Sequence, residues 1–132
     1  MKQEEKELLL KDICARLPYG VKVQTTYINP RTKEKTDIGT DVLSTVEISM
    51  LIDGYEEHKP YLFPLSSMTD EQKKEYRKVC ELDTERLSKH PMDGTPFPAL
   101  YNSQDWLSKH HFDYRGLIPM DLAIDATGLN IY

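Results

Sequence analysis

Residues 102–126, NSQDWLSKHHFDYRGLIPMDLAIDA, carry the only tryptophan of the chain and two of its four histidines. Asn102 or Ser103 suits the N-cap of a helix, because either side chain can accept a hydrogen bond from a free backbone N–H group. Residues three and four apart are neighbours on a helix, so Trp106 and His110 should share one face. The beginning of this stretch therefore predicts a short helix that turns its tryptophan toward the core.

A turn and a strand are expected to follow that helix. Residues 113–116, DYRG, are typical of a turn, in which the glycine supplies a permissive backbone. Apolar and polar residues then alternate over 122–126, which favours a final strand with Leu122, Ile124 and Ala126 on its buried face. We expect the helix, the turn and the strand to bury Trp106 between them.

Composition is that of a globular protein with a polar surface. The chain has 132 residues, of which 39% are hydrophobic and 30% charged, and its net charge is −5. This length predicts a single domain over residues 1–132, which can bury roughly two thirds of its unfolded surface. The acidic balance argues against broad binding to phosphate backbones. No apolar run approaches the ~20 residues of a membrane helix, and charges occupy the N-terminus, so we expect a cytoplasmic protein with no membrane partner.

The first third of the chain changes from helical to strand periodicity. Residues 3–17 place apolar side chains at helical spacing, and Pro18 and Gly20 should end that helix. Residues 21–27 alternate as a strand with one buried face. The polar residues 29–37 have the composition of an exposed loop or a hairpin end.

A β-branched run follows and predicts more sheet. Residues 41–54, DVLSTVEISMLIDG, alternate over one long strand or two short ones, with Asp53-Gly54 as a hairpin turn. Residues 55–65 can supply the next strand. Pro60 and Pro64 cannot donate to a ladder, which favours a position at a sheet edge or across the core for this segment.

The second half opens with a helix signal. Thr69 and Gln72 form a capping box, and Pro91 marks the latest end of the helix that follows. Residues 92–101 are expected to be a loop held down by Phe97 and Leu100. The two cysteines, Cys14 and Cys80, lie in no metal-ligand or CxxC spacing, which indicates free thiols packed in apolar helix faces.

These elements together predict an α+β fold. We expect a small antiparallel sheet packed with an N-terminal helix and two later helices. An SH3-like barrel formed by residues 18–65 is the alternative.

Three motifs resemble a known group of proteins. They are KELLLKDICARLPYGVKV at 6–23, KPYLFPLSSMTDEQKKEY at 59–76 and DWLSKHHFDYRGLI at 105–118. In this order they resemble small uncharacterised proteins of anaerobic gut bacteria, often encoded in prophages and other mobile elements. The resemblance implies an accessory protein that works in the bacterial cytoplasm. It carries over no catalytic residue and no cofactor.

The histidines are candidates for metal ligands or catalytic groups. Adjacent residues on a helix point about 100° apart, so His110 and His111 cannot grip one ion together as an i, i+4 pair could. Asp113 adds one carboxylate near His110 and His111. His90 and Asp93 lack a partner motif. Structural roles are favoured for all of these residues, and no cofactor is predicted. A small metal-dependent hydrolase with a site near His110 remains the alternative; the chain has no GxSxG, P-loop or GxGxxG motif.

Two groups are candidates for contact with a protein partner. Asp113, Tyr114 and Arg115 could form an internal ion pair with the tyrosine stacked beneath it, or could present a recognition tip, and the internal arrangement is favoured. Tyr61 and Phe63 could cover the sheet or take a peptide by strand addition.

One group is a candidate for nucleic acid. Arg31, Lys33 and Lys35 form a basic cluster on the loop 29–37, which Glu34 interrupts. The cluster lacks a stacking aromatic residue, so a solvated hairpin end is favoured over a nucleic-acid contact.

Three functional hypotheses follow. The first is a noncatalytic interaction module of a phage or mobile element that binds a host or phage protein. The second is a nucleic-acid-associated accessory factor that uses the loop 29–37, and the third is a small metal-dependent hydrolase. A flat apolar patch would favour the first, a basic face the second and a deep polar pocket the third.

Overall fold

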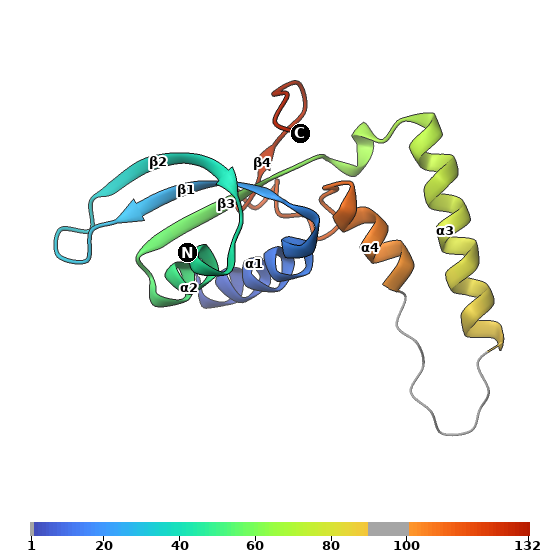
Figure 1. The fold of residues 1–132 in the computed structure, drawn as a ribbon, viewed down its shortest axis with the longest axis horizontal. Coiled ribbons are helices and arrows are strands. Elements are labelled where there is room, and N and C mark those ends of the chain that lie inside the picture. The colour runs from blue at the N-terminus through green and yellow to red at the C-terminus, as the bar shows by residue number, and fades with distance from the viewer. Residues whose placement is uncertain (1, 90–100) are drawn as a thin grey trace.

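The computed structural model describes the backbone of residues 2–89 and 101–132 and the side chains of residues 2–82 and 103–132. Within these ranges the fold is α+β, with four α-helices and one four-stranded sheet (Figure 1). The α-helices are α1 (Gln3–Arg16), α2 (Thr45–Asp53), α3 (Asp70–Lys89) and α4 (Tyr101–Lys109). The strands are β1 (Lys22–Ile28), β2 (Lys35–Val42), β3 (Glu56–Leu62) and β4 (Ile124–Asp125).

The sheet is mixed, in the order β2-β1-β3-β4. β1 pairs antiparallel with β2 and with β3, whereas β4 runs parallel to β3. The predicted small sheet with an N-terminal helix and two later helices is therefore confirmed, but the sheet is not purely antiparallel. β4 pairs only with Tyr61 and Leu62, so Pro60 has no strand partner on that side of β3.

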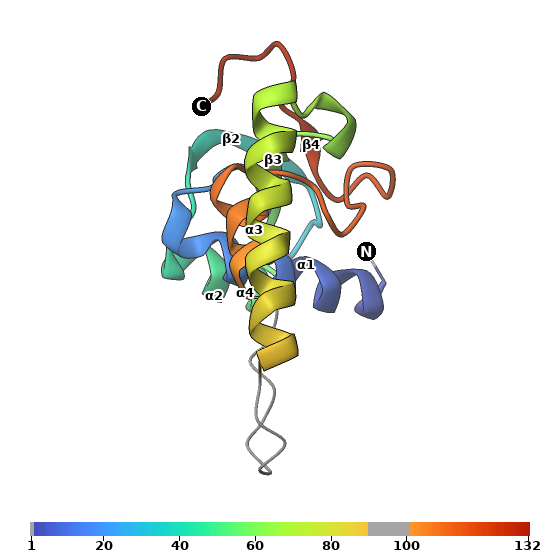
Figure 2. The same cartoon turned by 90° about the vertical axis from the view of Figure 1, so that its right-hand side faces the viewer.

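The helices form two groups around the sheet. α1 and α2 lie on one side of it, and α3 and α4 pack together beside it (Figures 1 and 2). α1 forms as predicted: Leu9 and Ile13, one turn apart, are fully buried in the core. Gly20 follows with a left-handed backbone, φ 67°, which glycine adopts without steric cost and which turns the chain into β1.

The strand prediction for residues 41–54 is wrong, because residues 45–53 form the helix α2. The Ser44 N–H donates to the Glu47 carboxylate at 3.1 Å, which caps the start of the helix. Gly54, with φ 83°, ends it and donates its N–H to the Leu51 carbonyl at 3.2 Å. Caps at both ends outweigh the strand preference of β-branched residues. Asp53-Gly54 is therefore a helix end rather than a hairpin turn, and the SH3-like barrel at 18–65 is excluded.

The capping box that starts α3 is confirmed. The Thr69 N–H donates to Gln72 Oε1 at 2.9 Å, and the Gln72 N–H donates to Thr69 Oγ1 at 3.2 Å. Residues 90–100, which include Pro91, Phe97 and Leu100, lie outside the described residues.

Trp106 is buried, but its neighbours differ from those predicted. α4 begins at Tyr101, so neither Asn102 nor Ser103 is the N-cap. The Trp106 ring lies 5.4 Å from Tyr76 of α3, and its Nε1–H donates to Glu75 at 2.9 Å. α3 therefore covers the tryptophan. The expected final strand is shorter than 122–126 and pairs with β3 instead, and Ile124 is only half-buried.

The prediction for the cysteines is wrong at Cys14, which is exposed, while Cys80 is half-buried. Cys14 directly follows the buried Ile13, and neighbouring helical residues point about 100° apart, so its side chain falls outside the buried face. No helix in the described ranges has both the length and the apolar character needed to cross a bilayer.

Candidate functional site

The turn at residues 113–115 faces inward. The Asp113 carboxylate, which is buried, accepts the N–H groups of Leu117 at 2.8 Å and Ile118 at 2.9 Å. The Asp113 N–H donates to the Phe63 carbonyl at 2.8 Å, and the Phe63 N–H donates to the His111 carbonyl at 2.8 Å. Two of the candidate partner-contact groups are thus joined to each other through the backbone and do not form a protruding tip.

Asp12, Arg16, Tyr114 and Arg115 form a cluster that we call the Asp12 cluster. Arg16 is fully buried and binds Asp12 through two hydrogen bonds, at 2.8 and 3.1 Å. Arg115 donates to the same carboxylate at 2.9 Å. The Tyr114 ring contacts both guanidinium groups, whose carbons lie 5.0 and 4.7 Å from its centroid. The tyrosine does lie against an ion pair, but the acid is Asp12 rather than Asp113.

Tyr61 and Phe63 are also engaged within the chain. Tyr61 is 8% exposed, and its hydroxyl hydrogen-bonds with the Thr40 hydroxyl at 2.9 Å. The half-buried Phe63 ring lies 6.3 Å from Phe112 and 5.9 Å from Tyr132. These contacts leave neither aromatic ring on a free sheet edge.

Tyr132 links the ends of two strands and stacks on a histidine. Its hydroxyl accepts the N–H of Lys22 at 2.9 Å and donates to the Tyr61 carbonyl at 2.8 Å. Burial raises the pKa of Tyr132 to about 12. The ring of His111 lies parallel to that of Tyr132, with centroids 3.7 Å apart. Burial, and then the charges of Arg16 and His110, lower the pKa of His111 to about 4.

The lowered pKa of His111 predicts a loss of stability in mild acid. The unfolded chain takes up the proton near pH 6.5, whereas the folded chain resists it down to about pH 4. Stability contributed by neutral His111 is therefore present above pH 6.5 and is lost as the pH falls toward 4. His111→Asn removes this titration, and asparagine tolerates the left-handed backbone at this position, φ 64°.

We expect urea denaturation between pH 7 and 4 to show a shallower decline in H111N than in the wild type. His58, whose pKa burial also lowers, titrates in both proteins and does not affect the comparison. Parallel pH profiles would contradict the assignment to His111.

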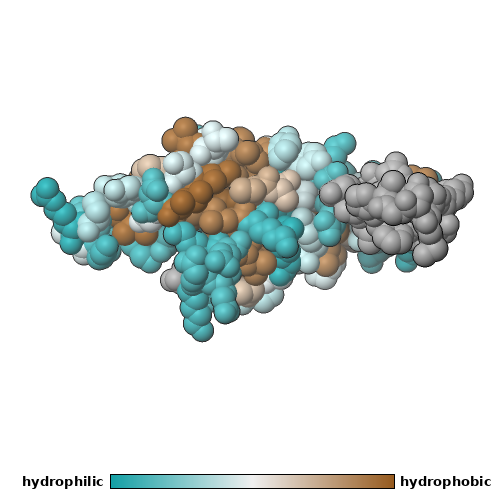
Figure 3. Space-filling view, turned by 90° about the horizontal axis from the view of Figure 1, so that it is seen from below, coloured by the Kyte–Doolittle hydropathy of each residue, from teal (hydrophilic) through white to brown (hydrophobic). Residues whose placement is uncertain are grey.

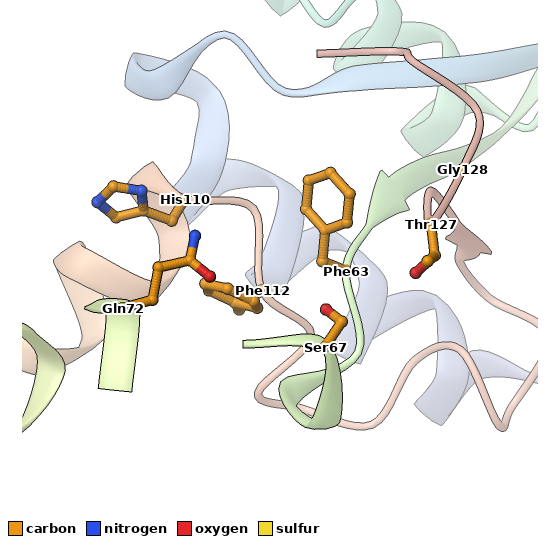
Figure 4. Close-up of a pocket in the computed structure, with 7 residues that line it drawn as sticks. All are labelled: Phe63, Ser67, Gln72, His110, Phe112, Thr127 and Gly128. Atoms are coloured by element: carbon orange, nitrogen blue, oxygen red, sulfur yellow. The ribbon is translucent and has the colours of Figure 1, made fainter. Parts of the chain in front are cut away.

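The other histidine of the pair, His110, lines a cavity of about 230 Å³ (Figure 4). Gln72 and His110 lie on one side of this cavity and Thr127 on the other. The His110 ring also contacts the Trp106 ring, with centroids 4.3 Å apart. The cavity can hold a small polar group by hydrogen bonds, but its lining includes no carboxylate to pair with the imidazole as an acid–base couple. The lining residues are Phe63, Ser67, Gln72, His110, Phe112, Thr127 and Gly128.

The structure does not assemble the candidate metal ligands. His110 and His111 contact different rings, those of Trp106 and Tyr132. The residues that the structure describes include no group of three His, Cys, Asp or Glu side chains placed to hold a metal ion. His90 and Asp93 lie outside the described residues.

The three cations of the loop 29–37 lie in two different places. Arg31 and Lys33 are exposed where the β1–β2 hairpin turns, at the end of the sheet far from α3 (Figure 1). Lys35 belongs to β2, and its Nζ lies 3.0 Å from the Glu57 carboxylate. An ion pair with Glu57 of β3, across the intervening strand β1, therefore occupies one of the three cations.

An apolar surface on α2 is the feature that sequence reasoning missed. Val46 is 68% exposed and Ile52 55%, and Leu51 is the only fully buried residue of the helix. Figure 3 looks at the side on which α1 and α2 lie and shows hydrophobic residues gathered over this part of the molecule. Five apolar residues in nine, between a capping box and a glycine, were the signal that could have revealed it.

α1 lies beside the end of α2. Lys6 Nζ donates to the Ile52 carbonyl at 3.1 Å, which brings the first half of α1 alongside the end of α2. We call the exposed side of α2 the α2 face. Val46 and Met50, four residues apart, form its apolar ridge, and Ile52 lies at its edge, about 120° around the helix from Val46.

Comparison with known proteins returned no match among protein-family models, curated proteins or solved structures.

Proposed function

We propose that the chain is a noncatalytic interaction module that binds another protein through the α2 face. In this proposal it is a cytoplasmic accessory protein of a phage or another mobile element, and its partner is a host or phage protein. The cellular setting is inferred from the resemblance of the three motifs at 6–23, 59–76 and 105–118. The binding surface is inferred from the exposed apolar residues of α2.

The exposure of α2 is the observation that carries the proposal. A helix with apolar residues all round is normally covered all round. In α2, Leu51 is fully buried and Ile48 packs against the core, yet Val46 and Ile52 remain exposed. Contiguous exposed apolar patches commonly mark sites of interaction between proteins.

Two further observations favour interaction over the alternatives. The cavity beside His110 is small and has no carboxylate in its lining, which gives little support to a hydrolase. Lys35 is paired with Glu57, so the loop 29–37 presents fewer free cations than its composition suggests, which gives little support to nucleic-acid binding.

Val46→Glu tests the proposal. We expect the tagged wild-type chain, expressed in its native host, to copurify with one protein in stoichiometric amount and V46E to lose it at least tenfold. Val46 lies in the first turn of α2, where a carboxylate complements the helix dipole, so the fold should be kept. Thermal unfolding of the purified variant checks this point.

Leu129→Glu is the matched control. Leu129 is 50% exposed and lies in the C-terminal segment, outside the α2 face. L129E should retain the partner. Equal recovery of the partner with V46E, or its loss with L129E, would contradict binding through the α2 face.

A further inference from the structure

The stretch of sequence that contains α2 is acidic. Residues 36–58, which include α2, most of β2 and the start of β3, contain six of the 22 acidic residues of the chain and none of its 17 lysines and arginines. The acids are Asp37, Asp41, Glu47, Asp53, Glu56 and Glu57.

Few of these charges are neutralised within the chain. Glu57 pairs with Lys35 at 3.0 Å. Glu56 lies 3.3 Å from His58, but burial lowers the pKa of that imidazole and keeps it neutral. Among the described residues, no ion pair with a lysine or arginine involves the other four acids. Asp53 also ends α2, where the helix dipole adds negative charge, and the Lys6 ammonium at the Ile52 carbonyl offsets part of it.

We propose that the α2 face binds a basic amphipathic helix of the partner protein, with apolar residues at helical spacing and Lys or Arg beside them. This inference rests on the proposed function and names the chemistry of the partner. The apolar residues of the partner cover the ridge of Val46 and Met50, and its cations lie beside the carboxylate of Asp53, on the same side of α2.

The geometry of α2 favours a helix as the occupant. Val46 and Met50 are four residues apart and form a ridge, and the small Ser49 lies beside them. Ridges of this kind pack into the grooves of another helix. A strand would need unpaired backbone groups such as those of the β2 edge, but that edge carries Lys35, Asp37 and Asp41 and an irregular register opposite Thr25 and Thr26. Charges and irregularities of this kind oppose strand addition.

Charge also argues against a second copy of this chain. A two-fold symmetric contact places the same surface against itself, so the unneutralised carboxylates of both copies would meet. A basic partner gains attraction where a second copy would meet repulsion.

Two synthetic helical peptides test this inference on the intact chain. They share the same leucines at positions i, i+3, i+4 and i+7, and the polar face is lysine in one and glutamate in the other. We expect the Leu/Lys peptide to bind in calorimetry, with an affinity that falls as salt is raised, and the Leu/Glu peptide not to bind. Val46→Ser should lower the affinity for the Leu/Lys peptide roughly tenfold, because burying a valine side chain contributes about 1.5 kcal/mol.

Asp53→Asn and Glu81→Gln separate local from general attraction. Both acids are exposed, but Glu81 lies on α3. D53N should lower the affinity for the Leu/Lys peptide roughly two- to fivefold, as expected for the loss of an exposed ion pair. E81Q should leave that affinity unchanged. Equal weakening by both substitutions would overturn the inference.

The remaining outcomes distinguish the inference from the proposed function. If both peptides bind equally, a basic helix as the partner is ruled out. The same follows if neither peptide binds while V46E still loses the native partner, and in that case the proposed interaction module is retained. If wild-type chain dimerises in sedimentation and V46E does not, the occupant is a second copy and the inference is overturned. If neither peptide binds and V46E keeps the native partner, both proposals fail.

Discussion

Asp12→Asn is expected to lower the free energy of unfolding by about 3–5 kcal/mol, the cost of leaving a buried charge without its counter-ion. Asp12 and Arg16 are both fully buried, and Arg115 donates to the same carboxylate. The asparagine keeps the shape of the side chain but leaves two guanidinium groups facing each other across a neutral amide. Urea denaturation followed by circular dichroism at pH 7 measures the loss.

Two companion variants identify charge as the cause. Glu7→Gln makes the same chemical change at an exposed position of α1 and should alter the free energy of unfolding by less than about 0.5 kcal/mol. Asp12→Asn combined with Arg16→Met removes the unpaired charge and should recover part of the stability. A loss of less than about 1 kcal/mol in D12N alone would show that Arg16 does not depend on this carboxylate.

Local signals predicted the elements whose ends are fixed by neighbouring residues. α1 ends where Pro18 and Gly20 follow it, and α3 begins at the capping box of Thr69 and Gln72. Each signal acts over a few residues, so a single sequence contains all of it. The same reasoning failed at residues 41–54 because the apolar residues Val46, Ile48, Met50, Leu51 and Ile52 fit a period of two about as well as a period of 3.6. The cap pair Ser44 and Glu47 decides between them.

The candidate site was only partly predictable, for a different reason. An aromatic residue beside an arginine in the turn at 113–115 indicated an internal ion pair, and the structure places Tyr114 against Arg115. The carboxylate they need comes from Asp12, 103 residues earlier in the chain. No local pattern contains that pairing. The α2 face was missed because it depends on which sides of a helix the rest of the fold leaves uncovered.

Trp106→Ala should cost about 3–5 kcal/mol of stability, as expected when a large buried aromatic side chain is removed. Trp106 is 7% exposed and stacks on Phe112 at 5.8 Å with an interplanar angle of 10°. It also contacts Tyr76 and bonds to Glu75, so it joins α4 to α3. Its removal should therefore loosen α3 selectively. Urea denaturation gives the total loss, and hydrogen exchange gives its distribution, with the largest increase in exchange expected along residues 70–82.

Trp106→Phe and Leu82→Ala resolve what the indole contributes. The phenylalanine keeps an apolar ring but loses the hydrogen bond to Glu75, so W106F should lie between the wild type and W106A in stability. Leu82, on α3 and 53% exposed, should change the free energy of unfolding by less than about 0.5 kcal/mol when replaced with alanine. If residues 70–82 exchange as slowly in W106A as in the wild type, contacts other than those of Trp106 hold α3 against α4. The loss of stability would then come from the cavity beside Phe112 alone.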